Sequence, residues 1–171
     1  MPITISGSGT VSGASEGIGP NSGTAVSASS AEVPFTGIPS WAKRITVVLA
    51  DVSTSGTSRV QIQLGTSTGY LTTGYTTTYG GFNASTQTSN PATSGFLIEG
   101  TSATDSRTVI ATFVLISGTT WVGTLHGKTN STDLAIAGGS IALGATLDRI
   151  RITTVNGTDA FDSGTVNILY E

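Results

Sequence analysis

Phe35-Thr-Gly-Ile-Pro-Ser-Trp-Ala-Lys-Arg-Ile-Thr-Val-Val-Leu-Ala-Asp51 contains the clearest strand signal of the chain. Gly37 and Pro39 predict a tight turn, because glycine tolerates positive φ and proline fixes φ. Trp41 follows at the expected entrance of the strand, where its ring can cover the end of a core. After it, alternate side chains share a face and most of them are β-branched. The segment therefore predicts a central strand over residues 43–51.

The composition of the whole chain agrees with a β fold. The chain has 171 residues, of which 37% are hydrophobic and only 10% are charged. That length suits one domain with a real core. Strong helix formers are scarce, and short Thr, Ser, Val and Ile runs are separated by Gly and Asn clusters. This pattern is typical of an all-β sandwich or barrel.

The remaining strands follow from alternation and from turn residues. Residues 59–64 alternate, with Val60, Ile62 and Leu64 expected to point inward and the residues between them to face solvent. We expect this strand to pair antiparallel with residues 43–51. Residues 65–94 are rich in Gly, Thr, Ser and Tyr, and much of this stretch is predicted to be a long loop. Further strands are predicted at 95–99, 108–116, 121–128, 134–137, 141–143, 147–154 and 166–170. Together they predict a jelly-roll-like antiparallel β-sandwich with an extended N-terminal arm.

One set of apolar residues is expected to form the core between the sheets. Its members are Ile45, Val47, Leu49, Val60, Ile62, Phe113, Ile150, Ile152 and Ile168. The strand at 108–116 carries apolar groups on both faces, which is more than one sandwich interior requires. Because monomers rarely expose large apolar patches, this surplus predicts a homotrimer. The alternative is that the long loop covers the second face.

The first 32 residues differ from the rest. They are mostly Gly, Ser, Thr and Ala, and such a segment buries too little apolar surface to order by itself. We therefore divide the chain into an N-terminal arm, residues 1–32, and a β-sandwich domain, residues 33–171. Ile3, Ile5, Val11 and Ile18 are candidate anchors by which the arm binds a partner or a neighbouring subunit.

No group of residues predicts catalysis, a cofactor or a metal site. His126 is the only histidine and the chain has no cysteine, so a surface strand histidine is the better interpretation. Asp159 and Asp162 are better explained as turn residues than as calcium ligands. Asn83, Asn130 and Asn156 each begin an Asn-x-Ser/Thr sequon, which is expected by chance in a chain this rich in Ser and Thr. We expect the protein not to be an enzyme.

Four aromatic residues are the candidate contacts with a glycan or a protein partner: Tyr70, Tyr75, Tyr79 and Phe82. Exposed rings there would stack on sugars, whereas buried rings would only pack under the loop. The net charge of −3 argues against a nucleic-acid partner. No stretch has the length of a membrane span and the N-terminus lacks a signal-peptide pattern, so we expect no membrane insertion.

Two segments resemble a known family. Thr36-Gly-Ile-Pro-Ser-Trp-Ala-Lys-Arg-Ile-Thr-Val47 and the C-terminal stretch Asp148–Glu171, with its Phe-x-x-Gly turn at 161–164, resemble parts of tailed-bacteriophage tail-fibre and related virion proteins. The resemblance covers about residues 33–65 and 105–171. It implies a terminal β-sandwich module and a place in the virion, after synthesis in the host cytoplasm, but no active site.

The resemblance leaves three functional alternatives. The first is a subunit displayed on the particle, of the tail-fibre or host-contact type, which is attached to other virion proteins by the arm and binds a host surface glycan. The second is a capsid decoration, or cement, protein that stabilises the head. The third is a free carbohydrate-binding module.

Overall fold

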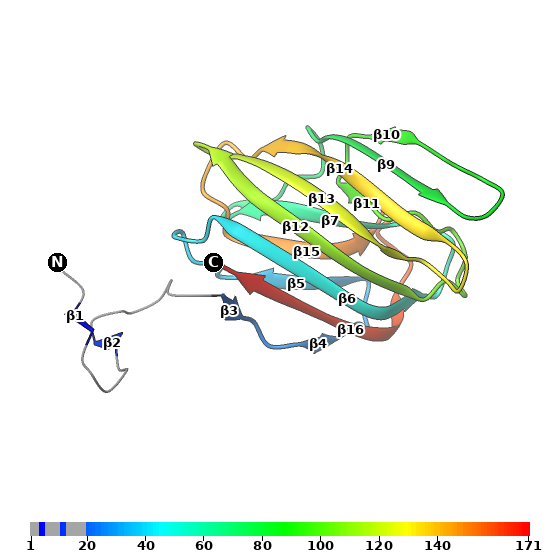
Figure 1. The fold of residues 1–171 in the computed structure, drawn as a ribbon, viewed down its shortest axis with the longest axis horizontal. Helices are drawn as coiled ribbons and strands as arrows, with labels where there is room; N and C mark the ends of the chain where they lie inside the picture. The colour runs from blue at the N-terminus through cyan, green and yellow to red at the C-terminus, as the bar shows by residue number, and fades with distance from the viewer. Residues whose placement is uncertain (1–3, 6–10, 13–19) are drawn as a thin grey trace.

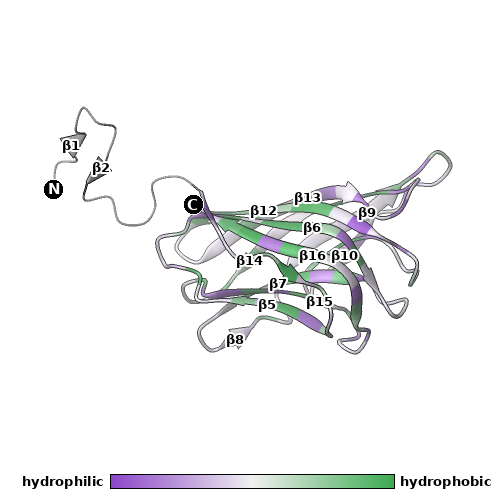
Figure 2. Cartoon of the chain, turned by 90° about the horizontal axis from the view of Figure 1, so that it is seen from below, coloured by the Kyte–Doolittle hydropathy of each residue, from purple (hydrophilic) through white to green (hydrophobic). Residues whose placement is uncertain are grey.

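The computed structural model describes residues 4–5, 11–12 and 20–171. Their regular structure is entirely β, and every pairing is antiparallel. The two main sheets lie face to face in two layers (Figures 1 and 2). The predicted all-β, jelly-roll-like antiparallel sandwich is therefore confirmed. The described residues contain no helix of the length and hydropathy that a membrane crossing needs.

The larger sheet has nine strands among the described residues. In spatial order they are β10 (Asn90–Ala92), β9 (Thr76–Phe82), β14 (Leu134–Ala142), β13 (Thr120–Lys128), β12 (Arg107–Ser117), β6 (Arg44–Thr54) and β16 (Phe161–Tyr170), with β3 (Asn21–Ser22) and β4 (Val26–Ser27) both paired to the free side of β16.

The smaller sheet forms the second layer. Its strands are β11 (Phe96–Leu97), β7 (Val60–Thr66), β15 (Arg149–Thr154) and β5 (Glu32–Thr36), with β8 (Gly69–Tyr70) paired to β7. A separate two-stranded pair joins β1 (Thr4–Ile5) to β2 (Val11–Ser12).

The chain crosses between the layers repeatedly, and this corrects one predicted pairing. β7 pairs with β15, β11 and β8 in the smaller sheet and not with β6, which lies between β12 and β16 in the larger sheet. The loop at 55–59 therefore carries the chain from one layer to the other and does not form a hairpin. Alternation alone cannot separate these two connections, because both leave one face of each strand buried.

The predicted core is confirmed. All nine of its members are buried, and all belong to one cluster between the sheets. Phe96 of the smaller sheet packs edge-on against Phe113 of the larger sheet, with ring centroids 5.0 Å apart, and against Tyr75 at 5.8 Å. Aromatic pairs in this geometry contribute about 0.5–1.5 kcal/mol each beyond their buried area. Phe96 thus links the two layers.

Several predicted boundaries were wrong. The region 65–94 contains more strand than a single long loop would, because β8, β9 and β10 lie within it with loops between them. β14 runs unbroken through Gly138 and Gly139, where two strands were predicted. β6 extends to Thr54, past a predicted loop start at Val52, and Val52 is buried. Each error comes from treating Gly or Thr as a loop signal in strands whose neighbours supply the packing.

The alternating strand β7 is more deeply buried than predicted. Gln61 and Gln63 were expected to face solvent but are 4% and 2% exposed. Both amides are covered by the segment before β11, where Ser94 bonds to both of them.

The body of the protein begins earlier than the composition indicates. Within the predicted arm, β3 and β4 pair with β16, and Ala28 is buried. The amide of Gly23 donates to the carbonyl of Ile168 at 2.7 Å. Small residues fit here, because a Cβ on Gly23 would lie 2.8 Å from the Ile168 side chain. Of the four candidate anchors, Ile3 and Ile18 lie outside the described residues, whereas Ile5 and Val11 fall in β1 and β2.

Candidate functional site

The outer face of the larger sheet is the main candidate for an interaction surface. Strand alternation sends Val109, Ala111 and Phe113 of β12 into the core and the residues between them outward. Neighbouring strands follow the same alternation, so that Ile110 lies beside His126 of β13, and His126 beside Ile136 of β14. We call this surface the apolar face, after its large exposed side chains: Phe82, Ile110, Val114, Ile116, Val122, Leu134 and Ile136.

These seven side chains are between 41% and 67% exposed, and Ile116 protrudes most. Single exposed apolar residues are normal on a protein surface, but a contiguous group over four neighbouring strands indicates an interaction site. The alternative considered from the sequence, a loop that covers this face, is excluded for these residues by their exposure.

Few charges interrupt the apolar face. Lys128 and Asp51 form an ion pair at 3.4 Å near one border, and Arg44 pairs with Glu171 near another. His126 is exposed in the middle of the face, as expected for a surface strand histidine. Because each of these charged side chains is paired with one of opposite sign, an interface over the apolar face would bury few unpaired charges.

A hollow of about 460 Å³ lies in the apolar face where the strands carry glycine. Gly138 presents no side chain there, and the nearest atom to a Cβ built on it is 3.7 Å away. Ile136 and His126 form one wall and Thr88 another. The apolar face therefore has both a protruding residue, Ile116, and a cavity into which a side chain fits.

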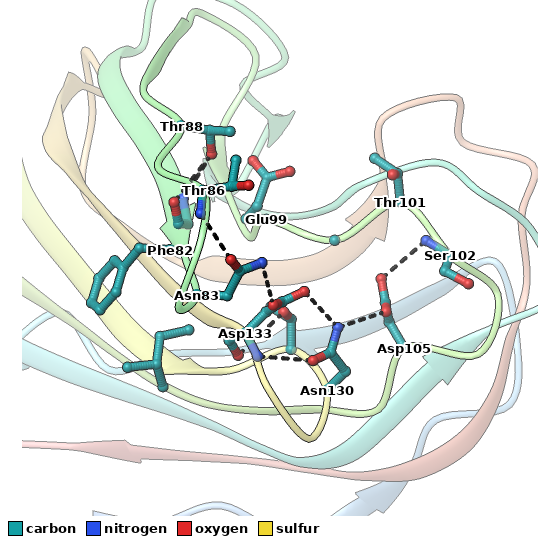
Figure 3. Close-up of a pocket in the computed structure, with 14 residues that line it drawn as sticks. Phe82, Asn83, Thr86, Thr88, Glu99, Thr101, Ser102, Asp105, Asn130 and Asp133 are labelled. Carbon is teal, nitrogen blue, oxygen red and sulfur yellow. Dashed lines mark hydrogen bonds between the residues drawn. The ribbon is translucent and has the colours of Figure 1, made fainter.

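A second, polar pocket of about 330 Å³ lies where β9 ends and β14 begins, beside Phe82 (Figure 3). Asp133 is at its centre and accepts hydrogen bonds of 2.8 Å from both Asn83 and Asn130. Both bonds lower the pKa of Asp133, and the bond from Asn130 contributes most. Asn130 also donates to Asp105 at 3.4 Å.

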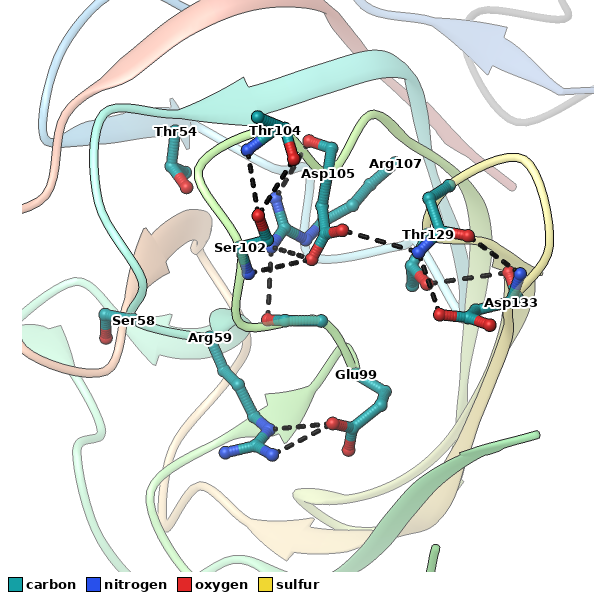
Figure 4. Close-up of polar contacts among 12 residues, drawn as sticks. Thr54, Ser58, Arg59, Glu99, Ser102, Thr104, Asp105, Arg107, Thr129 and Asp133 are labelled. Carbon is teal, nitrogen blue, oxygen red and sulfur yellow. Dashed lines mark hydrogen bonds and ion pairs between the residues drawn. The ribbon is translucent and has the colours of Figure 1, made fainter. Parts of the chain in front are cut away.

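Two arginine–carboxylate pairs support the back of this pocket (Figure 4). Glu99 accepts from Arg59 at 2.9 Å. The side chain of Arg107 is completely buried; it donates to the carbonyl of Gly100 at 3.1 Å and lies 3.5 Å from Asp105. Burial lowers the pKa of Arg107, and the charge of Asp105 opposes this effect.

The polar pocket holds loops together by means of carboxylates that already have partners. Asp105 accepts from the amide of Ser102, Asp133 binds two asparagines, and Glu99 is paired with Arg59. Within the residues that the structure describes, no three His, Asp or Glu side chains are placed to bind a metal ion. The arrangement explains the geometry of the loops and does not define a reaction.

The four predicted aromatic contacts do not form one site. Tyr75 is buried, its hydroxyl bonds to Leu64, and burial raises its pKa to about 12. Its proposed role as a glycan contact was therefore wrong. Alternation along β9 sends Tyr79 inward, where the guanidinium of Arg59 is 5.4 Å from its ring, and Phe82 outward. Tyr70 lies on the other layer of the sandwich.

The polar loop residues that the sequence singled out serve turns. The side-chain oxygen of Asn156 accepts from the amides of Thr158 and Asp159, both at 3.1 Å. Asp159 in turn accepts from the amide of Ser58 at 2.8 Å and so joins two loops that are far apart in sequence. Asp162 lies in β16 and accepts from the hydroxyl of Ser53.

Comparison with known proteins adds little. No protein-family profile matches the chain, and no curated protein sequence matches it. Among solved structures, a galectin of Caenorhabditis elegans, LEC-6, is 14% identical over 81% of this chain and 89% of its own length, with a TM-score of 0.33. The VP2 subviral particle of infectious bursal disease virus is 12% identical over 99% of this chain and 45% of its own, with a TM-score of 0.18. The fold assignment rests on this chain's own strands and pairings.

Proposed function

We propose that the protein is a structural subunit of a bacteriophage virion, displayed on the particle surface and assembled as a homotrimer through its apolar face. The observation that carries the proposal is the contiguous group of exposed apolar side chains on β9, β14, β13 and β12. The resemblance of residues 33–65 and 105–171 to tail-fibre proteins supplies the virion context. The N-terminal segment attaches the subunit to other virion proteins.

The size of the apolar face suits contact with a second copy of the chain. Four strands spaced about 4.8 Å apart, each about 30 Å long, give a surface of roughly 600 Å², near the lower end of the range for one partner in a stable interface. A stable interface buries about 800 Å² on each partner. Few charges would be desolvated, because the pairs Lys128–Asp51 and Arg44–Glu171 border the face.

The shape of the face favours a ring of copies over a symmetric pair. Ile116 protrudes at the end of β12, whereas the hollow around Gly138 lies on β14. A protrusion and a cavity at different places on one surface match a heterologous contact, in which each copy inserts into the next. Such contacts close into a ring when the rotation between copies permits, and three is the number that the family resemblance implies.

Light scattering on the purified chain tests the assembly. The wild type is expected at three times the 17.2 kDa chain mass. Ile136→Lys places a charge in the apolar face and should dissociate the trimer. Val155→Lys is the matched control, because Val155 is also 49% exposed but lies outside the apolar face, and it should leave the mass unchanged. A monomeric wild type would contradict the proposed trimer.

The virion assignment has its own test. Antibodies against the chain should label the surface of purified phage particles in negative stain, and particles from a strain that lacks the gene should not be labelled. Absence of the chain from washed particles would refute the virion role and leave the assembly result unaffected.

A further inference from the structure

The outer face of the smaller sheet is polar, in contrast to the apolar face on the opposite side of the sandwich. A hollow of about 450 Å³ lies on it, lined in part by Gln61, Gln63, Thr153 and Arg151. Register explains this grouping, because Gln63 is the cross-strand partner of Arg151, and Gln61 that of Thr153. Side chains from β7 and β15 therefore meet on the floor of one cavity.

The floor of the hollow is preorganised by hydrogen bonds. The Nε of Arg151 donates to the Gln63 side-chain oxygen at 2.8 Å, and Nη1 donates to Glu32 at 2.8 Å. The Tyr70 ring lies against the same guanidinium, 4.5 Å from its Cζ atom. Gln63 in turn donates to the carbonyl of Ser94 at 2.7 Å. A guanidinium has five N–H donors, and two of those of Arg151 bond to described residues, which leaves three that could bond to a ligand.

The charge and chemistry of the hollow select the class of ligand. Arg151 and Glu32 neutralise each other, so neither an anion nor a cation finds an excess of opposite charge. The amides of Gln61 and Gln63 are uncharged and are hydrogen-bonded to neighbouring protein groups, so they add no charge to the hollow. The two glutamine side chains are more than nine-tenths buried, so their orientation is fixed before a ligand arrives.

From this arrangement we infer that the hollow on the smaller sheet binds an uncharged saccharide of one or two rings. Its volume lies within the usual range for small-ligand sites, about 300–1,000 Å³. Arg151 binds hydroxyls, and Gln63, Tyr70 and Glu32 hold Arg151 in place. The inference does not depend on the apolar face, which lies on the other layer.

Solution NMR on the ¹⁵N-labelled full chain tests the site. The probes are methyl glycosides of glucose, galactose, mannose, rhamnose and N-acetylglucosamine, each added to about 20 mM, since single sugars bind weakly. At least one of them should shift the side-chain amide signals of Gln61 and Gln63. If none shifts these signals, or if the shifts map to the apolar face, the inference is overturned.

Two arginines on one strand provide the matched variants. Arg151→Met should weaken binding of the responding glycoside at least about tenfold, because it removes donors from the hollow. Arg149→Met removes an arginine that pairs with Asp148 outside the hollow, and binding should stay within about twofold of wild type. Equal losses in both variants would contradict the assigned site. If Arg151→Met does not fold, the Arg151→Lys variant and the residues whose wild-type signals shift test the site in its place.

The test remains separate from the assembly proposal. The Ile136→Lys variant should bind the responding glycoside as the wild type does. Loss of binding in that variant would mean that the saccharide site forms only in the assembled protein, and would refute a site complete within one chain.

Discussion

At the scale of single residues, asparagine side chains determine how the loops are built. Asn83, Asn130 and Asn156 were noticed as sequons, and each instead accepts backbone amides two or three residues ahead. The Asn-x-Ser/Thr pattern therefore marks turns in this chain.

Arg107 is the residue that the sequence describes least well. It begins a strand and would ordinarily face solvent, yet its side chain is fully buried beneath the loop 100–105. Charged groups are buried only with partners, and here the partners are the carbonyl of Gly100 and the carboxylate of Asp105. Both partners are near Arg107 in the sequence, but no periodic pattern predicts that the preceding loop folds back over its side chain.

Asp133 should make the stability of the fold depend on pH. Because hydrogen bonds from Asn130 and Asn83 lower its pKa, the folded chain binds fewer protons than the unfolded chain. Its contribution to stability is complete above its unfolded pKa, about 3.9 for an ordinary Asp, and is lost as the pH falls through the lower folded value. Thermal unfolding of Asp133→Asn between about pH 5 and pH 3 should therefore show a shallower fall in stability than the wild type.

A second variant tests whether the hydrogen bonds from asparagine cause the pH dependence at Asp133. Asn83→Ala removes one of the two donors, so the pKa of Asp133 should rise towards its ordinary value, and the loss of stability on acidification should be smaller and should end at a higher pH. An unchanged pH profile in both variants would show that Asp133 is not coupled to folding.

At the scale of elements, the strands with strong alternation were predictable and the glycine- and threonine-rich ones were not. β6, β12, β13 and β15 were all found from their apolar spacing. β9, with the sequence Thr-Thr-Thr-Tyr-Gly-Gly-Phe, was missed because its packing comes from β14 beside it. Gly80 is required there, since a Cβ on it would meet the carbonyl oxygen of Thr88 at 2.0 Å.

Of the two candidate sites, the sequence predicted the apolar face and not the polar hollow. The surplus apolar residues of β12 were visible in the sequence, because they repeat with a period of two. The polar hollow was not, because Gln63 and Arg151 lie 88 residues apart and meet only through the pairing of β7 with β15. The single alternating pattern at 59–64 indicated which face Gln63 would occupy but not what would lie next to it.

The four N-terminal strands should differ in how much they contribute to stability. β1 and β2 pair only with each other, whereas β3 and β4 pair with β16. Deleting residues 1–19 should therefore leave the free energy of unfolding unchanged. Deleting residues 1–30 also removes the hydrogen bonds of Gly23 and Ala28 to β16, each worth about 1 kcal/mol, so a loss of roughly 2–4 kcal/mol is expected in urea unfolding.

The longer deletion should also aggregate, because it uncovers the edge of β16. Equal stability of the two truncated chains would show that β3 and β4 contribute nothing to the body.

At the scale of the whole molecule, the sandwich has two dissimilar outer faces. The larger sheet presents isoleucine, valine and leucine to solvent, whereas the outer side of the smaller sheet carries the part-exposed arginines of β15 beside buried glutamine and threonine side chains. An assembly that buries the first face leaves the second one outward. In the proposed trimer, one side of the subunit would join the copies and the proposed saccharide site would lie on the other.

The stability of such an assembly must depend on protein concentration, because association favours the folded chain by mass action. For a trimer that dissociates on unfolding, a tenfold increase in concentration contributes on the order of 1 kcal/mol per chain, or about 2–4 °C in melting temperature for a chain of this size. Calorimetry at about 1 µM and about 100 µM, a hundredfold range, should show about twice this rise for the wild type and for Val155→Lys. The Ile136→Lys variant, which removes the association, should melt at one temperature throughout. A wild-type melting temperature that does not change over this range would mean that the apolar face is not buried between copies of the chain.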